Sequence, residues 1–279
     1  MNVVVLRLCG FILSLLIVIN SETQTIHSSQ QIPYIDLGTC SRNFINAFSF
    51  TNNQSVLSSQ QSLNAGAFDE RRFALAELNF CMFALSFPAA SGGIGLELNY
   101  FGFADYNESK IGIAYGRKLG KIIDAGIQLD YHLFHISGYG NAGAVNFEMG
   151  IFLHPAEKIT IGLHASNPVG GKIGKNSGEK IASVYKYAMG YEVSNETCIS
   201  VEIIKEEDRP LYANIGLQYF FAKQFFACIG IETSTASPFG GLGLKWKNIR
   251  VDISTRYHPE LGFSPALSVV FFTKNEDKN

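Results

Sequence analysis

The chain has 279 residues, with 22 basic and 24 acidic side chains, and only 16% of its residues are charged, against about 25% in soluble globular domains. Apolar residues form 47% of the sequence, which excludes an intrinsically disordered chain. The formal net charge of −2 offers no basic surface, so we expect no nucleic-acid partner.

The start of the chain, residues 1–20, has the pattern of a secretory signal peptide. Arg7 is the only charged side chain before Glu22, and a short apolar run from Leu8 to Ile19 follows it. This run is shorter than the roughly 20 residues that a helix needs to cross a bilayer. We therefore assign residues 1–20 to a signal peptide and expect the protein to be exported. The alternative is a buried helix or strand of the fold.

Residues 21–68 are rich in Ser, Gln, Asn and Thr and show no clean periodicity. We expect them to form an N-terminal periplasmic or plug segment. Cys40 in this segment, like Cys81, Cys198 and Cys228 further along, lacks the paired spacing of metal-binding cysteines. The sequence therefore predicts no metal and no cofactor, and it leaves the disulfide state of these cysteines open.

From about Phe80 to Phe272, apolar and polar residues alternate with period two in segments of roughly nine to eleven residues. This is the length of a tilted strand that crosses a bilayer. In the clearest segment, residues 123–134, Leu129 and its apolar neighbours lie on one face, and Gln128 and its polar neighbours lie on the other.

Tight connections alternate with longer ones along this region, as in an up-and-down barrel. The spacing predicts thirteen strands from Phe80 onward and a weaker strand over residues 71–78, which makes about fourteen. We assign residues 69–273 to the barrel and residues 274–279 to a polar C-terminal tail. With an even number of strands, we expect both termini on the periplasmic side.

Two features indicate which medium each face meets. The apolar rows are nearly free of charge, and the polar rows are rich in glycine, as a thin wall packed against a plug requires. The sequence therefore predicts an all-β fold: a transmembrane antiparallel up-and-down β-barrel of about 14 strands with an N-terminal lumenal plug segment, in contact with the lipid of the cell outer membrane. The alternative is a soluble barrel or sandwich. The glycines of the polar rows are Gly95, Gly112, Gly126, Gly150, Gly162, Gly190, Gly216, Gly230 and Gly243.

The polar rows also define candidate plug or ligand contacts in the lumen. The favoured interpretation is a salt-bridged, plugged interior, to which Arg42, Arg71 and Arg72 add positive charge. The alternative is a cation-selective or ligand-recognising lumen. The candidate residues are Glu97, Asn99, Asp124, Gln128, Asp130, His132, Glu148, His164, Lys186, Glu192, Glu202, Glu232, Arg250, Asp252 and Arg256.

Two of these residues, His132 and His164, would allow a barrel hydrolase with a Ser–His pair. No G-x-S-x-G elbow marks a nucleophile, and hydrogen bonding along the inner wall explains both histidines, so we expect no catalytic residue and no enzyme. The segment from Asn167 to Lys180 is rich in Gly and Lys but lacks the ending of a phosphate-binding loop. We interpret it as a mobile, basic external loop.

The segment 44–57 resembles the N-terminal region of FadL-like outer-membrane barrels. It contains Asn46-Ala47-Phe48 and then Asn52-Asn53-Gln54-Ser55-Val56-Leu57, where many members of that family have a Gly-Asn-Ala-Phe-like element and Asn-Pro-Ala-Gly-Leu. Gln54 replaces the proline of that motif, and Ser55-Val56 replaces Ala-Gly. The plug-motif residues are Asn46, Asn52, Asn53, Gln54 and Leu57.

The likeness is greatest to the PorV-like branch of Bacteroidota. This resemblance implies a fourteen-stranded barrel whose N-terminal segment folds into the lumen. It also implies the favoured function, a non-enzymatic outer-membrane barrel that acts in type IX secretion or as a scaffold, with a translocon or cargo protein as partner. The alternative is a FadL-like channel for a hydrophobic small molecule, and the third hypothesis is the hydrolase.

Overall fold

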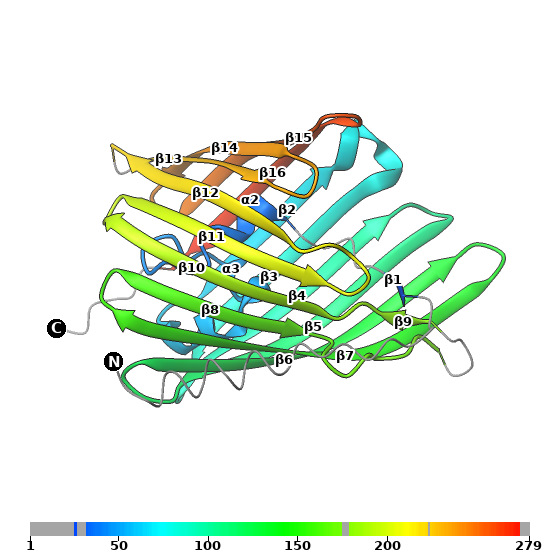
Figure 1. The fold of residues 1–279 in the computed structure, drawn as a ribbon, viewed down its shortest axis with the longest axis horizontal. Coiled ribbons are helices and arrows are strands. Elements are labelled where there is room, and N and C mark those ends of the chain that lie inside the picture. Colours follow the sequence, from blue (N-terminus) through cyan, green and yellow to red (C-terminus); the bar gives the residue numbers. More distant parts are fainter. Residues whose placement is uncertain (1–24, 27–31, 175–178, 223, 274–279) are drawn as a thin grey trace.

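The computed structural model describes residues 25–26, 32–174, 179–222 and 224–273, and it shows fourteen strands closed into an antiparallel barrel (Figure 1). Each barrel strand pairs with its neighbours in the chain, and the pairing of the last strand with the first closes the ring. The barrel fold predicted from the sequence is confirmed. The barrel strands are β2 (Asn64–Arg71), β3 (Asn79–Ala89), β4 (Gly92–Gly102), β5 (Tyr106–Lys118), β6 (Ile123–Ile136), β7 (Gly140–Ala156), β8 (Ile159–Ser166), β10 (Val184–Ser194), β11 (Thr197–Glu206), β12 (Tyr212–Phe221), β13 (Phe225–Glu232), β14 (Ser237–Trp246), β15 (Ile249–His258) and β16 (Gly262–Phe272).

The first strand differs in position from the prediction. It is β2, over Asn64–Arg71, and the predicted strand over residues 71–78 is instead two 3₁₀ turns, η2 (Arg72–Ala74) and η3 (Ala76–Leu78). Phe73 and Ala74 have φ angles of 55° and 59°, which an extended strand does not allow. The barrel therefore begins inside the range that we assigned to the plug. The predicted signal peptide, residues 1–20, and the tail, residues 274–279, lie outside the described residues.

The two faces of the barrel wall separate as the alternation predicts. Most outward side chains are apolar and exposed; Ile127 is 62% exposed and Leu242 66%. A soluble monomer rarely exposes apolar patches larger than a few hundred Å², so this continuous outer belt fits hydrocarbon better than water. Among the described helices, none is long and apolar enough to cross a membrane.

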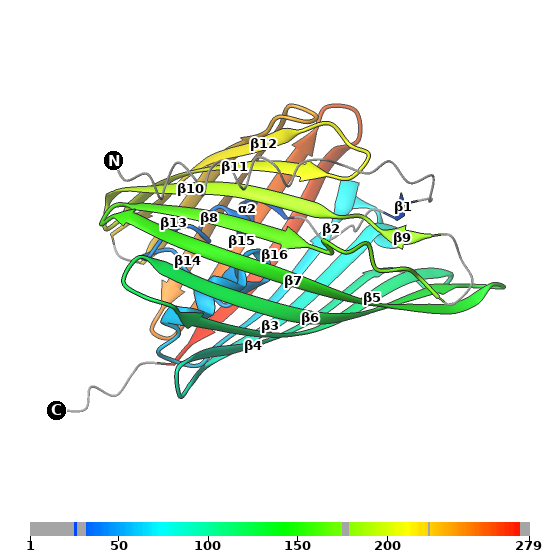
Figure 2. The ribbon, with the colours of Figure 1, turned by 60° about the horizontal axis from the view of Figure 1, so that its bottom comes forward.

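The two ends of the barrel differ in their connections. The tight turns and both ends of the strand meander, Asn64 and Phe272, lie together at one end, on the left of Figure 1. At the other end, β1 (Thr25–Ile26) pairs in parallel with β9 (Lys180–Ile181) (Figures 1 and 2). The meander thus starts and stops on one side, as expected, but the first described residues lie at the opposite mouth.

The described part of the predicted external loop is folded over this mouth. Ile173 and Ile181 are 2% and 3% exposed and pack with Phe134 and Ala144 of the inner wall. Asn167 holds the loop together, because its Nδ2 donates to the carbonyl of Ile181 at 2.6 Å and its Oδ1 accepts from the backbone N–H of Gly171 at 2.7 Å. These residues form an apolar cover and not the free basic loop that we expected.

Candidate functional site

The lumen is filled by residues 32–63, which form three short helical turns. These are α2 (Pro33–Asp36), α3 (Ser49–Asn52) and the 3₁₀ helix η1 (Gln54–Ser59), inside the barrel in Figure 1. Asn53 ends α3 and begins η1, because its Oδ1 accepts hydrogen bonds from the backbone N–H of Ser55 at 3.1 Å and from the Ser55 hydroxyl at 2.6 Å. Asn46 closes a similar turn with the N–H of Phe48 at 2.8 Å. Two of the plug-motif asparagines therefore shape the backbone.

Six of the nine predicted glycines of the polar rows face the plug, whereas Gly112, Gly230 and Gly243 face side chains of the wall. A Cβ atom at Gly190 would lie 1.9 Å from the carbonyl oxygen of Cys40, and one at Gly126 would lie 2.4 Å from the carbonyl carbon of Gln54. No side chain fits at such distances, so the thin wall that the glycine pattern predicts is the seat of the plug. Three further pairs are Gly66 with Phe48, Gly95 with Phe50, and Gly216 with Leu37.

The candidate polar residues all lie on the inner side of the wall. Glu192, Glu232 and Arg256 are half-buried. The others are buried: Glu97, Asn99, Asp124, Gln128, Asp130, His132, Glu148, His164, Lys186, Glu202, Arg250 and Asp252.

A lysine that the sequence analysis missed is the centre of the main polar cluster. The Nζ of Lys110 lies 3.0 Å from an oxygen of Glu97, 3.5 Å from Glu148 and 3.9 Å from Asp130, and Lys110 is 4% exposed. The Gln128 amide bridges Glu97 and Asp130 at 2.8 and 2.7 Å. Lys110 was not among the candidate residues, but its alternation with the apolar Ile111 and Ile113 could have placed it inside.

The plug reaches this cluster and its counterpart across the lumen through side-chain amides. Gln54 donates from Nε2 to Glu148 at 2.8 Å, and His164 lies 3.1 Å from the same carboxylate oxygen. Asn52 donates to Glu202 at 3.2 Å and accepts from Lys186. Gln54 therefore gives the plug a polar anchor at the position where the resembled motif has proline.

A second cluster joins the plug to the wall nearer the covered mouth. Glu70, fully buried, accepts from the Tyr34 hydroxyl at 2.9 Å and pairs with Arg72 at 3.1 Å and Arg256 at 4.0 Å. Burial and the Glu70 carboxylate raise the pKa of Tyr34 well above its usual value. Arg72 thus supplies counter-charge as predicted, whereas Arg71 points outward and is exposed.

Aromatic side chains between these polar clusters form two groups of ring contacts within one buried apolar cluster. The ring of Phe68 lies 6.1 Å from Phe80, 5.9 Å from Tyr34 and 6.3 Å from Phe48, and Tyr34 lies 6.4 Å from Phe239. Toward the tight-turn end, Phe44 of the plug stacks on Phe220 at 5.0 Å and lies 6.3 Å from Phe226. The inner rows, which the sequence analysis described as polar and glycine-rich, also carry the buried side chains of Phe68, Phe80, Phe226 and Phe239 and the half-buried side chain of Phe220.

Two of the spaces left between the plug and the wall are small. A cavity of about 30 Å³ lies between Tyr34, Phe48, Phe68 and Phe226, and another of about 10 Å³ lies beside Asn52. The first is of the order of one water molecule. Among the described residues, the plug therefore packs closely against the wall at both of these places.

The histidines that motivated the hydrolase hypothesis have other contacts. His164 bonds Glu148, and the ring of His132 stacks on Phe134 at 6.3 Å. Within the described residues, no serine hydroxyl is hydrogen-bonded to either ring. The absence of catalytic residues stays a prediction.

The cysteines provide a test of the packed plug. The described cysteines are free thiols, and burial raises the pKa of the Cys40 thiol. Because the thiolate is the reactive form, we expect Cys40 to resist maleimide at neutral pH in the folded protein and to react after denaturation, as measured by peptide mass mapping. Equal labelling rates in the two states would contradict a seated plug.

Comparisons with known proteins relate this barrel to solved channels. No family model and no curated protein matches the sequence. Similar structures include the toluene transporter TodX of Pseudomonas putida, with 9% identity, a TM-score of 0.58, and coverage of 91% of this chain and 100% of that one.

Two further matches agree with this one. The CymD monoaromatic hydrocarbon channel has 10% identity and a TM-score of 0.57 over 85% of this chain and 97% of its own, and the toluene transporter TbuX of Ralstonia pickettii has 8% identity and a TM-score of 0.56 over 82% and 93%. These structures do not support the PorV-like, Bacteroidota branch. The FadL-like resemblance is confirmed at the level of the fold: the chain folds as a plugged outer-membrane-type barrel.

Proposed function

We propose that this protein is an outer-membrane channel for small hydrophobic molecules, opened by movement of its plug. The observation that supports this most is the series of ring contacts inside the barrel, from Phe80 through Phe68 of the wall to Tyr34 and Phe48 of the plug. An apolar solute that passes along it can exchange one ring contact for the next without entering water. The similar structures named above are toluene transporters and a monoaromatic hydrocarbon channel, in agreement with this proposal.

The exposed apolar belt supports a location in the outer membrane, in contact with its lipid. Export by the signal peptide of residues 1–20 is part of the same proposal. The secretion role, with a translocon or cargo protein as partner, has no specific contact or surface among the described residues in its favour, so the solute channel is the function that we adopt.

Plug movement can be tested with a designed disulfide. A Cβ atom at Gly162 would lie 2.8 Å from the Sγ of Cys40, so a cysteine placed there is close enough to form a disulfide with Cys40. We expect oxidised Gly162→Cys protein in liposomes to lose uptake of labelled toluene, and we expect dithiothreitol to restore it. The reduced variant and the wild type should both exceed empty liposomes.

The matched control is Gly120→Cys, because a Cβ atom there has no neighbour within 4 Å. Oxidation should leave uptake by this variant unchanged. Uptake that persists in fully cross-linked Gly162→Cys protein would contradict gating by the plug, and wild-type uptake equal to that of empty liposomes would contradict the channel itself.

A further inference from the structure

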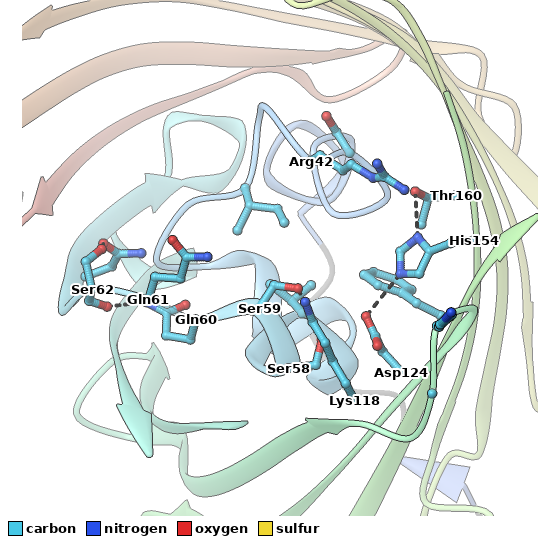
Figure 3. Close-up of a pocket in the computed structure, with 17 residues that line it drawn as sticks. Arg42, Ser58, Ser59, Gln60, Gln61, Ser62, Lys118, Asp124, His154 and Thr160 are labelled. Atoms are coloured by element: carbon cyan, nitrogen blue, oxygen red, sulfur yellow. Dashed lines mark hydrogen bonds and ion pairs between the residues drawn. The ribbon is translucent and has the colours of Figure 1, made fainter. Parts of the chain in front are cut away.

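A larger cavity, of about 580 Å³, lies at the tight-turn end of the barrel, on the far side of the plug from the covered mouth (Figure 3). One wall is the last part of the plug, residues 58–62, and the other comes from the ends of β5 to β8. Pockets of 300–1,000 Å³ are the usual size for small-molecule ligands. This cavity is separate from the aromatic series and differs from it in chemistry.

Its charge is positive. Arg42, Lys118 and Lys121 line it, against one carboxylate, Asp124. Asp124 is already engaged, because one of its oxygens lies 3.0 Å from Nε2 of His154 (Figure 3). Among the described residues, the three cationic side chains have no ion pair. An anionic group in the cavity would therefore meet free cationic donors.

The remaining lining is rich in hydroxyl and amide groups. Residues 58–62 read Ser-Ser-Gln-Gln-Ser and face the cavity, and Thr160 lies opposite them (Figure 3). Such side chains both donate and accept hydrogen bonds, which suits a ligand with many hydroxyl groups. Ile45 adds an apolar surface against which a sugar ring can pack. A purely hydrophobic solute would leave these polar groups without partners.

We propose that this cavity binds an acidic saccharide, a polyhydroxylated molecule that carries a carboxylate. The carboxylate would be held by Lys118 and Lys121 at the turn between β5 and β6, and Arg42 of the plug adds positive charge to the same cavity. The hydroxyl groups of the sugar would bond the serine and glutamine side chains of residues 58–62. This site is independent of solute passage through the aromatic series.

The test compares two disaccharides that differ in a single carboxylate, cellobiouronic acid and cellobiose. Both are titrated into the full-length protein in detergent at low ionic strength and followed by isothermal titration calorimetry. We expect cellobiouronic acid to bind at least tenfold more tightly than cellobiose, and we expect the double variant Lys118→Gln/Lys121→Gln to lose about tenfold in affinity for the acid.

The control variant is Lys158→Gln, at the turn between β7 and β8, because this lysine is at the same end of the barrel but does not line the cavity. It should bind like the wild type. Variants are compared only after a heat-dependent shift on a gel shows that each is folded. Equal affinity for the two disaccharides, no binding of the acid, or unchanged affinity in the double variant would overturn the proposal. If the protein binds cellobiouronic acid but takes up no toluene, the proposed saccharide site still holds and only the proposed channel function fails.

Discussion

Replacement of Lys110 by methionine is expected to destabilise the folded barrel by about 3–5 kcal/mol, the usual cost of removing one partner from a buried charge cluster. Methionine leaves the carboxylates of Glu97, Asp130 and Glu148 facing one another without the ammonium group that lies within 4.0 Å of all three. The free energy of unfolding can be measured by urea titration in detergent, followed by circular dichroism.

The control is Lys118→Met at the exposed rim of the barrel, where a surface substitution should change stability by no more than about 0.5 kcal/mol. Adding Glu97→Gln to Lys110→Met removes one of the unpaired charges and should recover part of the loss. An unchanged unfolding midpoint for Lys110→Met would show that this lysine does not hold the cluster together.

Replacement of Gly190 by valine is expected to displace the plug. Even the first carbon of the new side chain would lie 1.9 Å from the carbonyl oxygen of Cys40, and overpacking of this kind costs typically 1–3 kcal/mol when the structure can relax. Because the plug can relax by moving into the lumen, we expect Cys40 to become reactive to maleimide. We also expect the ion conductance of the protein in planar bilayers to rise several-fold.

Gly120→Val tests whether the effect is specific to the seat of the plug. A Cβ atom at Gly120 meets no other atom within 4 Å, so this variant should keep Cys40 protected and its conductance at the level of the wild type. If Gly190→Val also keeps Cys40 protected and its conductance at the wild-type level, the plug is not held by close contact with the glycines of the wall.

The strands were predictable because the two faces of a membrane barrel meet different media. The segment 123–134 shows this alternation along its length, and the strand observed there is β6, over Ile123–Ile136. In β2, the outward row is Ala65, Ala67, Asp69 and Arg71, which has too little apolar character to stand out. The strand prediction was therefore wrong where small and charged residues face outward.

The alternation also predicted that the polar residues point inward, but it did not predict which residues of the plug they bond. Gln54 and Glu148 are 94 positions apart in the sequence, and Asn52 and Glu202 are 150 apart. Such pairs depend on the path of the plug through the lumen, which no local pattern encodes. The inward phenylalanines were missed for a related reason, because part of the inner wall faces other side chains of the protein and not water.

The pairing of β16 with β2 makes the first and last strands structurally equivalent to all the others. In an open sheet, loss of a terminal strand merely moves the edge inward by one position. In this ring, a truncation before Gly262 would strip hydrogen-bond partners from β15 and β2 together, and each unsatisfied peptide group costs several kcal/mol in hydrocarbon. The C-terminal strand is therefore as indispensable as a central one, and cooperative unfolding of the whole ring follows from closure alone.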